Sequence, residues 1–197
     1  DLRETLGPDR LLTIATYAGV KYYDLKTAGQ YLDFVNIMTY DMGRPPYHHS
    51  ALYSSSKTRN SCVEAVEKHF QAGVPYEKLV LGVPFYGKPS EGESVDYIDI
   101  ISGEYSKYTR RWDDVSKVPY LVDAGGTMVL CYDDEQSLAL KADYIKSKGL
   151  LGAMYWSIEG DDASWTLSKA LASRLLGNAS EEPEEPGDDG LETYQVT

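Results

Sequence analysis

Hydrophobic residues gather along the chain in four compact runs, which read LLTIATY, FVNIMTY, LVLGVPFY and LGAMYW. Each run is six to eight residues long and shows little alternation with polar residues, which is typical of strands that are buried on both faces. We therefore predict four strands, at residues 11–17, 34–40, 79–86 and 151–156.

Amphipathic segments with helical spacing separate these strands. Residues 58–72 carry an apolar side chain at every fourth position, at Cys62, Val66 and Phe70. The same reasoning predicts helical segments at residues 22–31, 134–148 and 165–176. Strands that alternate with helices predict an α/β fold whose parallel sheet is covered on both faces. Four such strands form either a small open sheet or half of an eight-stranded barrel, and periodicity leaves both open.

Three segments lack this regular alternation. Residues 41–57 form a polar loop rich in Pro, His and Ser. Residues 88–126 are irregular, and their 39 positions leave room for a short hairpin or helix with little core of its own; a short strand follows at 127–132. Residues 178–197 contain seven acids and no base, which predicts a disordered acidic tail.

The first residues also have helical spacing. Leu2 and Leu6 lie one helical turn apart, and Gly7 and Pro8 end the pattern. We read this segment as the end of a helix that begins upstream, and we expect the chain to be part of a longer protein.

Charge and composition remove several classes of protein. The formal net charge of −12 argues against binding to a nucleic-acid backbone, although the tail carries more than half of it. No apolar run reaches the roughly 18 residues of a membrane helix, so we expect neither a nucleic-acid nor a membrane partner. Cys62 and Cys131 could form one disulfide, but neither lies in a metal-ligand spacing. We expect two buried thiols, no metal and no cofactor.

Candidate chemistry lies where the strands end, because parallel α/β folds build their sites at the carboxyl ends of the strands. Tyr40 and Asp41 end the second run, Tyr86 and Lys88 follow the third, and Trp156 ends the fourth. Aromatic faces beside directional hydrogen-bonding groups suit a sugar. The 17 tyrosines, against 3 Trp and 3 Phe, fit a polyhydroxylated ligand.

Five ordered segments carry a family resemblance. YLDFVNIMTYD at 31–41 closely resembles the sixth barrel strand of family-18 glycoside hydrolases, the chitinases and their relatives, and LVLGVPFYG at 79–87 resembles the seventh. GAMYWS at 152–157 is similar to the eighth strand and residues 11–19 to the fifth. YDDEQS at 132–137, followed by Lys141 and Tyr144, resembles the segment before the last-but-one helix.

The resemblance implies a (β/α)8 TIM barrel of which residues 1–177 form the C-terminal half, strands five to eight, with a short insertion between strands seven and eight. It implies hydrolysis of β-1,4 linkages next to N-acetylglucosamine. The family retains configuration by substrate assistance, with the acetamido oxygen of the substrate as the nucleophile. A secreted or periplasmic location is implied in the same way.

Roles follow residue by residue from the resemblance. Tyr40 would bond the acetamido group as it attacks, and Asp41 would bind sugar hydroxyls. Met38 would line the pocket beneath, Trp156 would form the floor under the −1 sugar, and Tyr86 would stand at the pocket wall.

The chain departs from the family pattern in three places. Lys88 stands where an arginine is common, which turns a forked contact to sugar into a point contact. Tyr17 stands where a proline is common, which puts little in doubt. The motif Asp-x-x-Asp-x-Asp-x-Glu, which carries the general acid, is missing: its nearest frame begins at Asp96 and has Ile101 and Gly103 at the last two required positions.

Several candidate residues also have plainer interpretations. Tyr40 and Trp156 could be ordinary core aromatics. The pair His48 and His49 lacks a third ligand at metal-binding spacing. We expect it to be solvated in the loop, with sugar contact at the groove rim as the alternative.

The acidic residues near two helix starts have plainer interpretations as well. The cluster at 133–135 is placed to cap the helix that follows it. Of the acids after the fourth strand, we expect one to cap the last helix.

Three functions remain open. The chain is part of a chitinase-like hydrolase, a non-catalytic protein that binds chitin or N-acetylglucosamine oligosaccharides, or an inactive truncated product. In each case half a barrel leaves two exposed strand edges, so we expect the N-terminal half of the barrel or a second copy to cover them. The upstream coding sequence separates the three functions.

Overall fold

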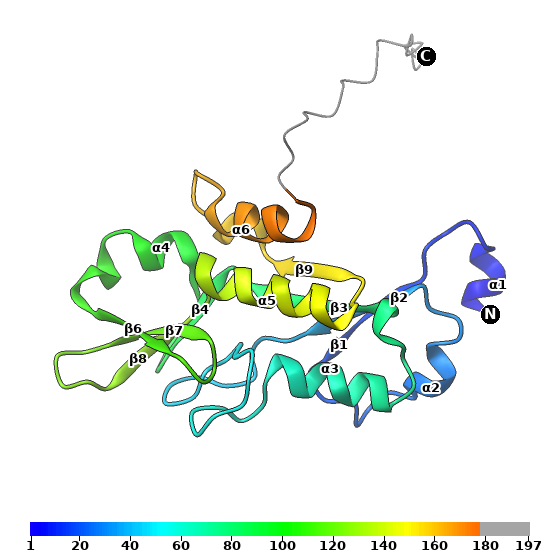
Figure 1. The fold of residues 1–197 in the computed structure, drawn as a ribbon, viewed down its shortest axis with the longest axis horizontal. Helices are drawn as coiled ribbons and strands as arrows, with labels where there is room; N and C mark the ends of the chain where they lie inside the picture. The colour runs from blue at the N-terminus through cyan, green and yellow to red at the C-terminus, as the bar shows by residue number, and fades with distance from the viewer. Residues whose placement is uncertain (178–197) are drawn as a thin grey trace, which may run out of the picture.

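The computed structural model describes residues 1–177, so the predicted tail at 178–197 lies outside the described residues. Its centre is a four-stranded sheet with the strand order β1-β2-β3-β9, visible in Figure 1. All three pairings are parallel, which confirms the α/β fold and the parallel pairing of the four predicted strands. The strands are β1 (Thr13–Tyr17), β2 (Phe34–Met38), β3 (Leu79–Pro84) and β9 (Gly152–Trp156).

Helices follow the strands as the periodicity predicts, and α3, α5 and α6 lie along one face of this sheet (Figure 1). Short 3₁₀ turns add η1 (Tyr76–Lys78), η2 (Glu104–Lys107) and η3 (Ile158–Gly160). The helices that accompany the parallel strands are α1 (Leu2–Leu6), α2 (Leu25–Ala28), α3 (Cys62–Gln71), α5 (Glu135–Lys148) and α6 (Thr166–Leu175).

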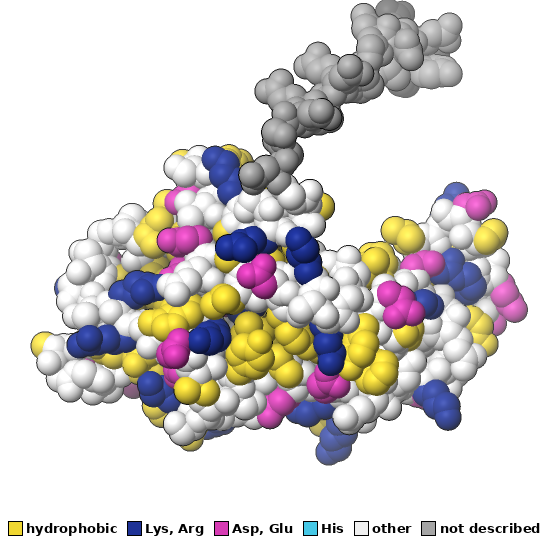
Figure 2. All heavy atoms as spheres, viewed as in Figure 1, with side chains coloured by type: hydrophobic (Ala, Val, Ile, Leu, Met, Phe, Trp, Pro, Cys, Tyr) yellow, Lys and Arg dark blue, Asp and Glu magenta, His cyan; other side chains and the backbone are white. Residues whose placement is uncertain are grey.

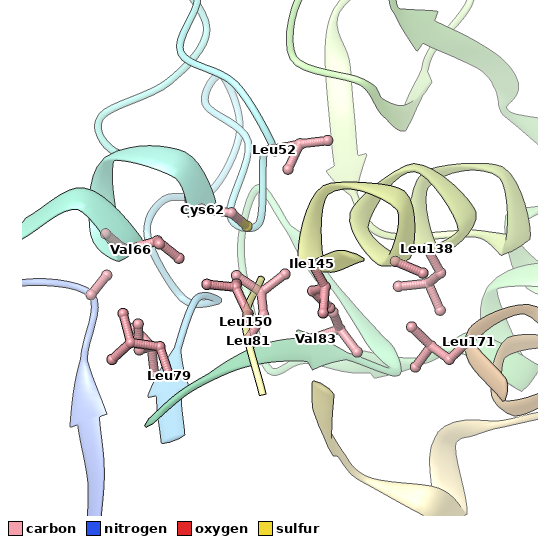
Figure 3. Close-up of a cluster of buried hydrophobic side chains, with 14 of the residues drawn as sticks. Leu52, Cys62, Val66, Leu79, Leu81, Val83, Leu138, Ile145, Leu150 and Leu171 are labelled. Atoms are coloured by element: carbon pink, nitrogen blue, oxygen red, sulfur yellow. The ribbon is translucent and has the colours of Figure 1, made fainter. Parts of the chain in front are cut away.

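The core lies between the parallel sheet and the helices α3, α5 and α6. Figure 3 shows Leu79, Leu81 and Val83 of β3 directed toward the helices, and all three are fully buried. They meet Val66 of α3 and Ile145 of α5 in one hydrophobic cluster. Burial of such side chains contributes about 1.5–3 kcal/mol each, so this layer is the main source of stability.

The opposite face of the sheet is largely open among the described residues. Side chains alternate along a strand, and the residues between the buried ones, such as Asn36 and Met38, are only half-buried. Tyr17, at the end of β1, is 67% exposed. The prediction of a sheet covered on both faces is therefore wrong for residues 1–177: the described helices cover only one.

Acidic side chains begin two of the helices. The Asp134 carboxylate accepts the backbone N–H of Ser137 at 3.0 Å, which confirms its predicted capping role, and Gly149 ends α5 in the left-handed conformation. At α6, Asp161 accepts the N–H of Leu167 and Asp162 accepts the N–H of Thr166, each at 3.0 Å. Two residues share the capping that we expected of one.

The excursion after β3 is larger than the predicted hairpin or helix. It forms a five-stranded antiparallel sheet with the order β5-β4-β8-β7-β6 and a helix, α4 (Tyr97–Ile101). Its two ends pair with each other, since Lys88 faces Cys131 across β4 and β8, so the excursion spans residues 86–131. Its strands are β4 (Tyr86–Pro89), β5 (Val95–Asp96), β6 (Thr109–Asp113), β7 (Val118–Val122) and β8 (Met128–Cys131).

Phe85 connects the parallel sheet to the antiparallel excursion. Its N–H donates to the carbonyl of Trp156 at 2.8 Å, and its own carbonyl accepts the N–H of Tyr97 at 2.9 Å. The Phe85 ring stacks on Tyr155 with centroids 4.7 Å apart. Because β4 begins one residue after Phe85, the excursion is joined to the parallel sheet without a linker.

The two histidines in the loop between β2 and α3 are buried, so the prediction of a solvated pair is wrong. His48 is 1% exposed and His49 is fully buried. The His48 Nε2 lies 3.1 Å from the Asp113 carboxylate in β6, and its ring meets the edge of Tyr120. The polar loop is thus packed against the antiparallel sheet, a contact between distant segments that its composition does not reveal.

An ion pair between Lys141 of α5 and Asp133 is closed to water. The Lys141 Nζ lies 2.6 Å from Asp133 Oδ1, and both side chains are completely buried. The hydroxyls of Ser137 and Ser50 donate to the same carboxylate. The group therefore joins the end of β8, the helix α5 and the loop that carries the two histidines.

The two cysteines, Cys62 and Cys131, are free and buried, as predicted. None of the helices in residues 1–177 is long and apolar enough to cross a bilayer. Figure 2 shows acidic and basic side chains interspersed on one face, around hydrophobic side chains that gather between α3 and α5.

Replacing Lys141 by methionine should destabilise the chain by about 3–5 kcal/mol, because it leaves the buried Asp133 charge without its partner. Denaturant unfolding measures the loss. Lys148→Met is the matched control on the same helix: Lys148 pairs with Glu67 at a site where both side chains are about one-third exposed, and its loss should change the midpoint little. Equal losses from the two variants would contradict this account.

Candidate functional site

The strand ends place the predicted site residues along one edge of the parallel sheet. Tyr40 and Asp41 follow β2, Tyr86 and Lys88 belong to β4, and Trp156 ends β9. β2 pairs with β3, and β3 pairs with β9. The carboxyl ends of these strands therefore lie side by side, and so do the residues that follow them. Met38 precedes them on β2, half-buried on the open face of the sheet.

Asp41 is the centre of the polar contacts. The Tyr86 hydroxyl donates to Asp41 Oδ1 at 2.7 Å, and the Lys88 Nζ lies 3.1 Å from the same oxygen. Asp41 adopts the left-handed conformation with a φ of 57°, and its side chain is 54% exposed. Among the described residues only Oδ1 is engaged, so Oδ2 is free to accept a ligand hydroxyl.

Both tyrosines at this edge are held in the neutral form. Burial, followed by the hydrogen bond to Asp41, raises the pKa of Tyr86 far above its ordinary value. Burial, followed by the negative charge of Asp41, also raises the pKa of Tyr40. Each phenol therefore keeps its proton at neutral pH and can donate it in a hydrogen bond.

A glycine allows Tyr40 to pack closely. The Tyr40 hydroxyl lies 3.9 Å from the Met154 sulfur of β9, across β3. A Cβ on Gly82 would stand 2.5 Å from the Ile37 carbonyl oxygen, 2.8 Å from Met154 Cε and 3.0 Å from Tyr40 Cε1. Sequence reasoning did not assign roles to Gly82 and Met154; the signal for the first was a glycine inside a buried strand, which often marks a close approach.

Trp156 is not a core residue, because its side chain is 63% exposed. Tyr40, by contrast, is half-buried, and its ring meets the Tyr86 ring edge-on at 6.1 Å. The plain interpretation of both as core aromatics therefore fails for Trp156. An exposed indole next to a cluster of hydrogen-bonding groups can serve as a stacking surface.

His49 also belongs to the cluster around Asp41, although the sequence predicted that this histidine is solvated. Its Nδ1 lies 4.0 Å from Asp41 Oδ1, and its ring tilts against Tyr86 with centroids 5.4 Å apart. Burial lowers the pKa of His49 to about 4. Asp133 and Asp41 oppose this shift, while Lys141 and Lys88 add to it, so the imidazole is neutral at pH 7.

These residues gather where the parallel strands end, and residues 1–161 match the family described as glycosyl hydrolases family 18. The chain belongs to this family. The resemblance noted in the five sequence motifs is thereby confirmed, and the α/β fold is that of a TIM-barrel family. Among the described residues no group of three or more His, Cys, Asp or Glu side chains is arranged to hold a metal ion.

Family-18 relatives and structures give the scale of the match. Chitinase A1 of Niallia circulans is 36% identical, over 86% of this chain and 30% of that protein. Chitinase ChiA74 from Bacillus thuringiensis superposes with a TM-score of 0.78 at 32% identity, over 90% of this chain and 37% of that one.

A mutant class V chitinase from Nicotiana tobaccum, solved in complex with NAG4, gives a TM-score of 0.74 at 27% identity, over 88% and 58% of the two chains. The chain spans 30–42% of the length of the first curated relatives it matches.

Gly82→Ala should destabilise the chain by about 1–3 kcal/mol, the usual cost of adding volume to a packed site, and should displace Tyr40 and Met154. Thermal unfolding measures the loss, and the aromatic NMR signals of Tyr40 report its displacement. Gly152→Ala is the matched control, since a Cβ there meets nothing within 4 Å. If the two alanines behave alike, the close packing around Gly82 does not constrain Tyr40.

The stability of the chain should fall as the pH is lowered from 6.5 toward 4. The folded state favours neutral His49, whose pKa drops from 6.5 to about 4, so its contribution is complete above 6.5 and is lost on acidification through this window. Urea unfolding at pH 7, 5.5 and 4.5 measures the trend. The free energy of unfolding of His49→Asn should depend less on pH. His48 and His69, whose pKa values are also lowered by burial, contribute equally to the pH dependence of both proteins. If the two proteins lose the same stability between pH 7 and 4.5, His49 does not cause the trend.

Proposed function

We propose that this chain supplies strands five to eight of a family-18 (β/α)8 barrel, which hydrolyses β-1,4 bonds next to N-acetylglucosamine. The observation that carries the proposal is the convergence of Tyr86 and Lys88 on one oxygen of Asp41, beside Tyr40 and the exposed Trp156. Relatives named as chitinases support the reaction class, and the NAG4 complex of the tobacco enzyme supports the ligand class.

The chemistry follows from the substrate's own acetamido group. Its oxygen attacks the anomeric carbon while the glycosidic bond breaks, and a carboxylic acid outside this chain protonates the leaving oxygen. Water then opens the resulting cyclic intermediate from the other face, so the configuration at the anomeric carbon is retained. This chain contributes the groups that hold the sugar and orient the acetamido group.

Each site residue has a role suited to its surroundings. Tyr40 donates its hydroxyl to the acetamido group, which its raised pKa allows. Asp41 accepts a sugar hydroxyl on Oδ2, while Tyr86 and Lys88 hold Oδ1. Trp156 stacks under the sugar ring. Met38 lines the pocket below, on the half-buried part of β2, and Tyr86 also forms part of the wall.

The open edges of the sheet require a covering partner. β1 and β9 are edge strands with one paired side each, and unpaired edges of this kind attract further strands. We propose that the N-terminal half of the barrel covers both edges, with a second copy of the chain as the alternative. The complete protein is proposed to be secreted or periplasmic, where polymeric chitin is accessible.

The coding sequence upstream of Asp1 decides between hydrolysis and its alternatives. An Asp-x-x-Asp-x-Asp-x-Glu motif there supports the hydrolase. Replacement of its glutamate supports a protein that binds N-acetylglucosamine oligosaccharides without cleaving them. A start codon immediately before Asp1 supports an inactive truncated product.

In the complete protein, Tyr40→Phe should lower kcat more than it raises KM, because its hydrogen bond strengthens as charge develops on the acetamido group. A cost of about 2–4 kcal/mol corresponds to roughly 30- to 1000-fold in kcat. Steady-state kinetics on a chitooligosaccharide measures both constants, and the isolated chain, which lacks the acid motif, serves as the blank.

Tyr31→Phe is the matched control for this substitution, because Tyr31 is exposed before the start of β2, at the opposite edge of the sheet. It should leave both constants unchanged. A Tyr40→Phe enzyme with unaltered kcat would remove Tyr40 from the mechanism, whereas a large loss of kcat in both variants would point to a general effect of tyrosine removal.

A further inference from the structure

The environment of His49 differs from that of the other fully buried histidine, His69. In His69 both ring nitrogens are within hydrogen-bonding distance of a partner, at 2.8 Å from the Thr16 hydroxyl and 2.8 Å from the Ala65 carbonyl. His49 is equally buried, yet neither of its nitrogens has a hydrogen-bond partner among the described residues. Because an unpaired buried N–H is costly, its retention calls for a partner that the site acquires.

Asp41 is a hydrogen-bond acceptor close to the ring that can move. The Nδ1 of His49 lies 4.0 Å from Asp41 Oδ1, about 1 Å longer than a hydrogen bond. The imidazole has little room to approach, because the ring is fully buried and the backbone carbonyl of His49 accepts the N–H of Met42 at 3.0 Å. Asp41, in contrast, is half exposed, so its carboxylate is free to shift.

We propose that His49 is a positioning residue for Asp41, whose carboxylate receives the His49 Nδ1–H when a sugar hydroxyl engages it. The inference rests on the proposed function of Asp41 in sugar binding. Tyr86 and Lys88 keep their contacts with Oδ1, and the sugar hydroxyl binds Oδ2. The buried imidazole then holds the carboxylate from below and prevents it from turning away from the sugar.

Burial, rather than the charges around the ring, favours a neutral donor over an imidazolium. Lys141 and Lys88 disfavour a positive ring, and they offset the attraction of Asp133 and Asp41. Tyr86 packs against the ring as a neutral phenol. His49 can therefore donate one proton to Asp41 without adding a net charge to the closed interior.

The tautomer of His49 tests the first step without any sugar. Nitrogen-15 NMR of the complete protein at pH 7, with no sugar added, should show a neutral His49 imidazole that carries its proton on Nδ1. This measurement is independent of the proposed function, so it stands even if the complete protein neither binds nor cleaves chitooligosaccharides. A proton on Nε2, or an imidazolium at pH 7, would overturn the proposal.

Two substitutions separate the position of the donor from the volume of the ring. Asparagine places an amide group close to the position of Nδ1, whereas glutamine places it close to Nε2. In the complete enzyme, His49→Phe should lower kcat/KM for a chitooligosaccharide about tenfold. His49→Asn should recover at least half of this loss on a logarithmic scale. His49→Gln should be as impaired as His49→Phe. Equal activities of the Asn and Gln variants would overturn the role of Nδ1.

A double-mutant cycle tests whether the effect acts through Asp41. In an Asp41→Asn background, His49→Phe should change kcat/KM less than twofold, because the carboxylate that it positions is gone. The matched control is His48→Phe, whose ring contacts Asp113; it should change kcat/KM less than twofold in either background. Equal losses from His49→Phe with and without Asp41 would show that His49 acts by packing alone.

Discussion

The buried ion pair between Lys141 and Asp133 is the contact on which the rest of this structure depends. Its two charges are shielded from water, so each is tolerated only while the other is present. The Asp133 carboxylate also accepts hydroxyls from α5 and from the loop after β2. One closed group therefore fixes the position of α5 on the sheet and the path of the loop.

This arrangement connects the interior to the candidate site around Asp41. The loop that reaches Asp133 through Ser50 carries His49 next to it in sequence, and His49 packs under Asp41 and Tyr86. The chain of contacts runs from the buried Asp133 carboxylate to His49 and then to the exposed Asp41 carboxylate. The ion pair and His49 are closed to solvent, whereas Asp41 is half exposed, so the contacts lead from the interior to the surface.

Much of the fold was predictable because the decisive signals are local. The runs at 34–40 and 79–86 are continuous and apolar, and a strand buried within an α/β fold requires that pattern. Gly149 and Asp134 mark the ends of α5 by their own backbone and capping chemistry. The site residues Tyr40 and Asp41 were predictable because they directly follow such a strand.

The rest depends on partners that are distant in the sequence. Residues 109–111 of the edge strand β6 are exposed, and β7 contains Pro119, so this hairpin lacks the alternation by which strands are recognised. The burial of His48 depends on Asp113, 65 residues later. No local pattern encodes that contact, and a polar loop composition points toward solvent instead.

The direct junction of β3 and β4 has a consequence for protein engineering. Tyr86 and Lys88 lie at the root of the antiparallel sheet, and Phe85 joins that root to the carbonyl of Trp156 and to α4. A graft that exchanges the whole excursion between relatives would carry both partners of Asp41 with it and would change the candidate site. Crossover points beyond Pro89 and before Leu130, a pair facing each other across β4 and β8, would exchange the outer part of the antiparallel sheet and leave the contacts of Asp41 intact.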